Sequence, residues 1–99
     1  MVDFQRKVLD LVKMIPKGKV TTYLELAKAA GIPKGWRIVA MILSKNPTPV
    51  VIPCHRVVRS DGSLGGYIFG IKKKAELLAS EGIPVRNGKV DLKKYMFYF

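Results

Sequence analysis

The first fifteen residues place hydrophobic side chains at the spacing of one face of an α-helix. These side chains stand at positions i, i+4, i+7, i+8 and i+11, namely Phe4, Val8, Leu11, Val12 and Ile15. The periodicity predicts an amphipathic helix over residues 3–15. The run Pro16–Lys19 contains both proline and glycine, which interrupt helices, so the chain is expected to turn there.

Two further helical segments follow. Residues Tyr23–Ala30 have apolar positions at helical spacing, and Gly31 provides the stop. Residues Trp36–Ser44 predict a third helix that is apolar almost all round except at Arg37. The segment Asn46–Pro49 ends this helix, because neither of its prolines can continue one.

The second half of the chain mixes an apolar segment, turns and one more helix. Residues 50–58 are apolar and fit either a strand or irregular buried chain. Residues 71–81 fit a helix, and Asn87-Gly88 between two valines predicts a hairpin turn. The aromatic segment 95–99 is expected to pack back against the rest of the protein.

Three short helices followed by a small β element are typical of helix-turn-helix and winged-helix domains. We therefore predict a mainly α fold with a small β element, in which a winged-helix-like helix-turn-helix is built on a three-helix bundle. A chain of 99 residues has the length of one small domain, residues 1–99. The pattern favours DNA binding and says nothing of catalysis.

The charge of the chain indicates what it binds. Eighteen Lys and Arg residues against seven Asp and Glu give a net charge of +11. Such an excess predicts a polyanionic partner, either nucleic acid or an acidic membrane surface. The lysines Lys72–Lys74 stand at a helix start, where the helix dipole disfavours cations. We expect them to be a phosphate-facing or solvated cluster.

Several classes of protein do not fit the sequence. No apolar run is long enough for a transmembrane helix, and no signal segment opens the chain, so we expect no membrane association. The single Cys cannot form an internal disulfide, and one Cys with one His cannot build a four-ligand zinc site. We expect no metal and no cofactor, and a reducing cytoplasmic location, or the nucleus in a eukaryote.

The only cysteine and the only histidine are neighbours, and an arginine follows them. A thiolate is the reactive form of cysteine, and cationic or hydrogen-bonding neighbours lower a thiol pKa. Cys54, His55 and Arg56 supply both kinds of group. The residues alone leave a second interpretation open, in which Cys54 is a small buried hydrophobe. Neighbouring side chains of a regular strand also point to opposite faces, which argues against a simple dyad.

This run and several others resemble a known family. Residues 53–57 (Pro-Cys-His-Arg-Val) are similar to the active-site signature of the O6-alkylguanine-DNA alkyltransferases, the methylated-DNA–protein-cysteine methyltransferases. Residues Gly18–Tyr23 resemble the start of their helix-turn-helix, and Gly31–Lys34 with Arg37 resemble the turn and the start of their recognition helix. Asn46-Pro47 resembles their asparagine hinge. Gly62, Gly65–Tyr67 and Gly70 resemble their active-site loop, and Leu77-Leu78 with Glu81-Gly82 resemble their closing helix. The resemblance covers about residues 3–92.

The resemblance implies a set of catalytic roles. Cys54 would accept the alkyl group from guanine O6 and become a stable thioether, so each molecule would act once. His55 would act as base toward the thiol through a bridging water, and Glu81 would orient the imidazole. Asn46 would hold the turn before the active site.

It also implies roles in binding duplex DNA that contains O6-alkylguanine. The residues involved would be Tyr23, Arg37, Arg56, Val57 and Tyr67. Tyr23 would lie beside the 3′ phosphate and help rotate the target nucleotide, and Arg37 would enter the base stack in place of the flipped base. The carbonyls of Cys54 and Val57 would read the guanine amino group, while Tyr67 would form a wall of the pocket.

The sequence departs from the family in two respects. Most members carry a second, N-terminal α/β domain, whereas this sequence starts at the first helix of the catalytic domain. Family members also have small residues where this chain has Ile38, Met41 and Ile42 in the recognition helix and Ile68 and Phe69 in the active-site loop. These larger residues are expected to change the approach to DNA or the alkyl groups that fit.

Three functions remain to be compared. The leading hypothesis is direct repair of O6-alkylguanine by a monomeric, single-turnover methyltransferase. The alternative is an alkyltransferase-like sensor that binds alkylated DNA without transfer and recruits a repair-pathway partner; such proteins typically lack the reactive cysteine, and Cys54 is present here. A plain winged-helix binder would leave Cys54, His55 and Glu81 without a role. A cysteine protease is disfavoured, because so short a chain offers little room for a peptide cleft.

Overall fold

Short helices and two very short strands are joined by long connections. In the computed structural model, which describes the backbone of residues 2–99 and the side chains of residues 4–99, the elements are α1 (Val2–Lys13), β1 (Thr21–Thr22), α2 (Tyr23–Ala29), α3 (Trp36–Ser44), the 3₁₀ helix η1 (Cys54–Arg56), β2 (Val57–Val58), α4 (Ile71–Ser80) and α5 (Leu92–Tyr95). The predicted mainly helical fold with a small β element is confirmed.

The first three helices pack around a common apolar cluster. Buried side chains from all three form it, namely Val8, Val12, Leu26, Ala27, Val39 and Leu43. Helix α3 has the predicted bounds, whereas α2 ends one residue earlier than predicted, at Ala29. The side chain of Thr22 caps α2 by accepting a hydrogen bond from the backbone N–H of Glu25 at 3.1 Å. These helices form the predicted helix-turn-helix half of the protein.

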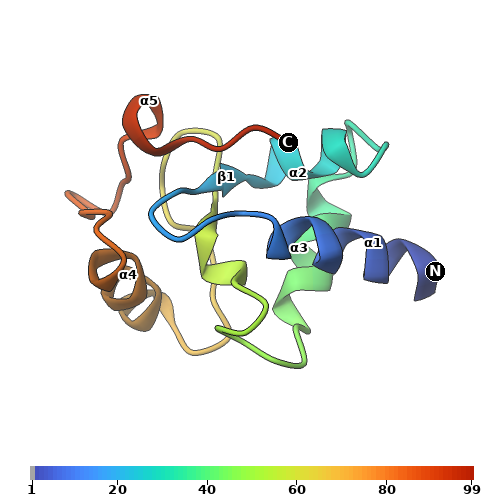
Figure 1. Ribbon diagram of the computed structural model, residues 1–99, viewed down its shortest axis with the longest axis horizontal. Helices are drawn as coiled ribbons and strands as arrows, with labels where there is room; N and C mark the ends of the chain where they lie inside the picture. Colours follow the sequence, from blue (N-terminus) through green and yellow to red (C-terminus); the bar gives the residue numbers. More distant parts are fainter. Residues whose placement is uncertain (1) are drawn as a thin grey trace.

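The small sheet joins two segments that are distant in sequence. Strands β1 and β2 pair in parallel, with Thr21 opposite Val57 and Thr22 opposite Val58. In Figure 1 the sheet lies between the half of the molecule that contains α1, α2 and α3 and the half that contains α4. Because β1 runs directly into α2 and β2 directly follows η1, this pairing fixes the start of α2 relative to Cys54.

A second apolar cluster joins Val20 to residues of the second half of the chain, including Leu78 of α4. It consists of Val20, Val58, Leu64, Leu78, Ile83 and Val90. The predicted hairpin turn is present, with Asn87 and Gly88 both at positive φ (55° and 73°) and Arg86 and Lys89 joined by backbone hydrogen bonds of 2.9 and 3.0 Å. Two successive residues with positive φ are the mark of a type I′ turn, which favours Asn-Gly.

The C-terminal segment packs back against the protein, as predicted. The backbone N–H of Val20 donates to the carbonyl of Tyr95 at 2.9 Å, and its carbonyl accepts from the N–H of Phe97 at 2.7 Å. The Phe97 side chain packs against the first apolar cluster. The short helix α5 was not predicted from the sequence.

Within residues 2–99, no helix combines the length and apolarity needed to cross a membrane.

Candidate active site

Cys54 lies at the start of η1 and lines a cavity of about 330 Å³. The thiol is buried, and the cavity is also lined by residues of α2, α3 and the loop before α4, among them Tyr23, Ala40 and Tyr67. The segment that carries Cys54, His55 and Arg56 is a 3₁₀ turn and not a strand. Successive side chains of a 3₁₀ helix are about 120° apart. The objection that neighbouring strand residues face opposite ways therefore does not apply.

Asn46 holds the turn that leads to Cys54. Its side-chain amide donates to the carbonyl of Ile52 at 2.8 Å, and its side-chain oxygen accepts from the N–H of Thr48 at 3.0 Å. Both ends of the buried amide are thus used within the turn. Val50, inside the same turn, has φ = 76°, a conformation that β-branched residues rarely adopt. The side chain of Asn46 therefore ties this turn together, and its role in the active site stays a prediction.

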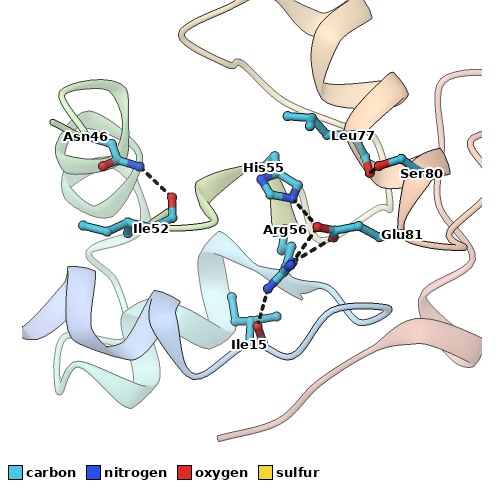
Figure 2. A network of polar contacts seen from close by, with 8 residues as sticks. All are labelled: Ile15, Asn46, Ile52, His55, Arg56, Leu77, Ser80 and Glu81. Atoms are coloured by element: carbon cyan, nitrogen blue, oxygen red, sulfur yellow. Dashed lines mark hydrogen bonds and ion pairs between the residues drawn. The ribbon is translucent and has the colours of Figure 1, made fainter. Parts of the chain in front are cut away.

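His55, Arg56 and Glu81 form one polar network (Figure 2). His55 Nε2 lies 3.0 Å from Glu81 Oε2. Arg56 reaches the same carboxylate through two bonds, from Nε to Oε1 at 2.8 Å and from Nη2 to Oε2 at 2.7 Å, while Nη1 donates to the carbonyl of Ile15 at 2.8 Å. The sequence grouped Arg56 with the DNA-binding residues. The structure turns its guanidinium inward instead, where it fixes Glu81.

The network determines which histidine nitrogen is available. A carboxylate only accepts hydrogen bonds, so Nε2 carries the proton in the contact with Glu81. Nδ1 is then the nitrogen with a free lone pair; it is buried, has no hydrogen-bond partner among the described residues, and points away from Glu81 in Figure 2. Among the described residues, the contact with Glu81 thus leaves the Nδ1 lone pair of His55 able to accept a hydrogen bond.

Burial and hydrogen bonds set the protonation states of these groups. Burial lowers the pKa of His55, and the hydrogen bond to Glu81 offsets this only in part, so the ring is neutral at neutral pH. Burial alone would raise the pKa of Glu81, but hydrogen bonds from Arg56 and His55 outweigh it and keep that pKa below its usual range. Burial raises the pKa of Cys54, while Asn46 and the charge of Lys74 oppose the rise.

Two tyrosines, Tyr23 and Tyr67, line the cavity that contains the Cys54 thiol. Tyr23 lines the Cys54 cavity and also a second one of about 480 Å³, which extends over Trp36 and Arg59. Burial raises the pKa of Tyr23 to about 12, with the nearby Cys54 as a smaller cause. The ring of Tyr67 lies edge-on to that of His55, at 6.4 Å between centroids. Both residues line the cavity that contains Cys54, and their roles toward the DNA stay predictions.

Lys74 is the residue of this region that the sequence analysis missed. It was expected to belong to a solvated cluster, yet its side chain is 0% exposed, whereas Lys72 and Lys73 are exposed. Its ammonium group lies 3.5 Å from the hydroxyl of Tyr23. The only signal in the sequence was the unfavourable position of a lysine in the first turn of a helix.

The outer face of α3 combines a cation with apolar side chains. Arg37 is exposed, and its guanidinium lies 5.1 Å from the centre of the Trp36 ring. Ile38 and Met41 are 39% and 55% exposed, whereas Ile42 packs against the core. Of the larger residues noted in the recognition helix, Ile38 and Met41 therefore face outward.

In the described part of the chain, no cluster of three His, Cys, Asp or Glu residues is arranged to bind a metal.

Comparison with known proteins gives a consistent result. The family described as 6-O-methylguanine DNA methyltransferase, DNA binding domain, matches residues 3–83. The methylated-DNA–protein-cysteine methyltransferase of Methanothermobacter thermautotrophicus is 54% identical over 82 residues, which are 82% of this chain and 45% of that protein. The chain thus spans less than half the length of this curated relative.

Two solved structures resemble the whole chain or most of it. Schizosaccharomyces pombe Atl1, in complex with damaged DNA containing O6-carboxymethylguanine, is 31% identical with a TM-score of 0.88, covering 100% of this chain and 98% of that one. Mycobacterium tuberculosis OGT in complex with DNA is 39% identical with a TM-score of 0.79, covering 81% of this chain and 49% of that one. The match over residues 3–83 and the identity to the methyltransferase place this chain in the 6-O-methylguanine DNA methyltransferase family.

Proposed function

We propose that residues 1–99 repair O6-alkylguanine in duplex DNA by transferring the alkyl group irreversibly to Cys54. The observation that carries this proposal is that Cys54 lines a cavity while the next residue, His55, has a buried Nδ1 with no hydrogen-bond partner among the described residues. A sensor that only bound the lesion would need the cavity but would have no use for a fixed base. The presence of Cys54, His55 and Glu81 together therefore favours transfer.

The transfer step balances without any cofactor. The sulfur of Cys54 attacks the alkyl carbon, a carbon–sulfur bond forms, and the bond from that carbon to O6 breaks. The electron pair of the broken bond stays on the guanine, which then takes up a proton. The thiol proton passes through a water molecule to Nδ1 of His55, and Glu81 stabilises the resulting imidazolium. Because no step breaks the thioether again, one chain repairs one lesion.

The same proposal assigns roles to the residues around the cavity. An alkyl group on a stacked base is out of reach, so the nucleotide must rotate out of the duplex, at a cost of a few kcal/mol. Arg37, exposed on α3, would fill the vacated place in the stack, and Tyr23 would contact the backbone beside the flipped nucleotide. Tyr67 would form one wall of the pocket for the flipped base. The net charge of +11 would attract the DNA phosphates.

A second candidate function is a sensor of alkylated DNA. The observation in its favour is the match to Atl1 over the full length of both chains, at a TM-score of 0.88. Such a protein would bind the lesion in the same cavity and recruit a repair partner. The two functions differ in one measurable respect, which is whether the alkyl group moves to the protein.

The test is the intact mass of the protein after incubation with duplex DNA that carries one O6-methylguanine. Repair predicts a gain of one methyl group per chain, mapped to the peptide that contains Cys54, and no gain in Cys54→Ala. The alanine variant should keep its DNA affinity, because phosphate contacts dominate binding. Tight binding of the lesion with no gain in mass would reject transfer and support the sensor.

A further inference from the structure

We propose that the second cavity, of about 480 Å³, is a nucleotide-binding site in which Trp36 stacks on a base and Arg59 binds a phosphate of the DNA strand that carries the lesion. Its ligand is the nucleotide next in the strand to the one that enters the Cys54 cavity. This inference rests on the proposed function for the identity of the strand. The side chains that carry it belong to the second cavity itself.

The two cavities are neighbours. Tyr23, Ala40 and Gly66 line both of them. Consecutive nucleotides of a strand are joined covalently, so a nucleotide that enters the Cys54 cavity brings its neighbour to the mouth of the second cavity. The volume of that cavity lies within the range of about 300–1,000 Å³ that is usual for small-ligand sites. The second cavity thus has the size and the position to receive one nucleotide.

Trp36 is the first residue of α3 and forms part of the wall of the second cavity. It is 45% exposed, and it is not among the side chains that pack against either apolar cluster. An indole that buries so little surface adds little to the stability of the fold. Its flat aromatic ring is suited instead to stacking on a nucleotide, because every base has a face that can stack.

The stacking of a base on Trp36 is coupled to the movement of Arg37. The guanidinium carbon of Arg37 lies over the Trp36 ring, 5.1 Å from its centre, which is within the range of a cation–π contact. In the proposed complex Arg37 enters the base stack of the duplex, so this face of the indole loses its cation. A base of the neighbouring nucleotide can then cover the same face.

The second cavity also has a cation, Arg59, which directly follows β2. Its guanidinium group forms no ion pair among the described residues. Asp61 lines the same cavity, but its Oδ1 accepts from the N–H and the hydroxyl of Ser63, at 2.9 and 2.6 Å. The charge of Arg59 acts on Tyr23, where it opposes the rise in pKa that burial causes. A guanidinium group in this position can bind a phosphate through two parallel hydrogen bonds.

The first measurement uses Trp36, the only tryptophan of the chain, as a fluorescent probe. Its emission is followed while undamaged single-stranded oligothymidylate is added to the parent protein, so no alkyl group is needed and no duplex has to be opened. Stacking should quench most of the emission. Thymidine monophosphate at the same nucleotide concentration should quench far less, because a free nucleotide has no linked neighbour in the Cys54 cavity.

The second measurement is the affinity for the same oligonucleotide, read from the anisotropy of a label on the DNA. Trp36→Leu keeps an apolar side chain but loses the aromatic face, and it should weaken binding about tenfold. Trp36→Tyr keeps an aromatic face and should bind within about threefold of the parent protein. Met41→Leu is the matched control, because Met41 is 55% exposed on α3 and lines neither cavity; it should bind like the parent.

The third measurement is the salt dependence of binding. Arg59→Gln should reduce the slope of log affinity against log salt concentration by about 0.7, the value for one phosphate contact on a single strand. Arg86→Gln removes another exposed arginine, one that lines neither of the two cavities, and should leave the slope unchanged. Melting curves give the folded fraction of each variant. The quenching experiment uses the parent protein and decides the stacking even if a variant fails to fold.

The outcomes separate this inference from the proposed function. Absence of binding, or binding without quenching of Trp36, would overturn the stacking, and an unchanged salt slope in Arg59→Gln would overturn the phosphate contact. Equal quenching by the free nucleotide would make the cavity a site for free nucleotides, contrary to the proposal. Quenching with the expected variant effects, in a protein that takes up no methyl from O6-methylguanine duplex, would support the second site and reject repair. Methyl uptake without quenching would do the reverse.

Discussion

Tyr23 lies directly against the backbone of Gly65. A Cβ atom at position 65 would lie 3.0 Å from both Cε2 and the hydroxyl oxygen of the tyrosine, and Gly65 has φ = 72°. Glycine is therefore favoured at position 65 for two reasons: the backbone has a positive φ, and the Tyr23 ring leaves no room for a side chain. Any larger residue there has to move the ring that lines both cavities.

The first prediction concerns this contact. Gly65→Ala should displace Tyr23 and lower both lesion binding and transfer, in addition to a stability loss of about 1 kcal/mol from the strained backbone. Gly88→Ala is the matched control, because Gly88 has φ = 73° and no atom within 4 Å of a built Cβ. It should lose similar stability and keep its transfer rate. Equal transfer rates in the two folded variants would contradict the role of the contact.

The second prediction concerns Glu81 and pH. Because its pKa lies below the ordinary value of 4.5, its ionised form stabilises the folded state at pH values above 4.5, and this contribution is lost as the pH falls through the folded-state pKa. At pH 7, Glu81→Gln should lower the free energy of unfolding by about 2 kcal/mol, since Arg56 loses its charged partner. The difference from the parent protein, measured by urea unfolding, should shrink as the pH falls below 4.5.

Activity provides a second measurement on the same variant. Glu81→Gln should slow transfer about a hundredfold, because the base His55 loses the group that fixes its tautomer. Glu76→Gln, an exposed change on α4, the helix that Glu81 directly follows, is the control and should have no effect on stability or transfer. A stability difference that is the same at pH 7 and at pH 4 would refute the assignment of the carboxylate charge.

The third prediction concerns Arg37. Arg37→Ala should weaken binding to lesion-containing duplex and slow transfer from it, because the vacated place in the stack is no longer filled. Reaction with the free base O6-methylguanine should change little, as no duplex has to be opened. Lys34→Ala, which removes an exposed charge just before α3, controls for the loss of phosphate attraction. Equal losses on the duplex and on the free base would rule out insertion into the stack.

The fourth prediction concerns the strained turn before the active site. Val50 has φ = 76° and is 47% exposed, so Val50→Gly relieves backbone strain and loses little burial. The free energy of unfolding should rise by about 0.5–1 kcal/mol in urea unfolding. Val51→Gly is the control, because Val51 is 79% exposed and lacks a positive φ, and it should lose stability. A loss of stability in both variants would show that position 50 carries no strain.

The sequence predicted those features that depend on neighbouring residues. The bounds of α3 followed from an apolar run closed by prolines, and the Asn87-Gly88 turn followed from residues that tolerate positive φ. Cys54, His55 and Glu81 were placed through a resemblance, and the structure does bring His55 and Glu81 into contact. Their roles in catalysis stay predictions.

Features that depend on distant partners could not be predicted in this way. The parallel pairing of Thr21 with Val57 has no local signal, because a turn does not join the two strands. The sequence analysis assigned Arg56 to DNA binding and Lys74 to a phosphate-facing or solvated cluster. Arg56 turns inward to Glu81, and Lys74 turns inward to backbone carbonyls. Every residue has a backbone carbonyl, so the sequence does not indicate which carbonyls a lysine will bind.

The backbone bonds of Val20 have a consequence for how the protein is made. Val20 immediately precedes β1, and both of its peptide groups are held by residues from the last turn and tail of the chain, Tyr95 and Phe97. During synthesis these partners are made long after Val20, so the approach to α2 stays unanchored until residues 95–97 have been translated. Contacts of such large sequence separation also form slowly. The site around Cys54 should therefore mature only after residues 95–97 have left the ribosome, and a nascent chain that ends before them should not compete for damaged DNA.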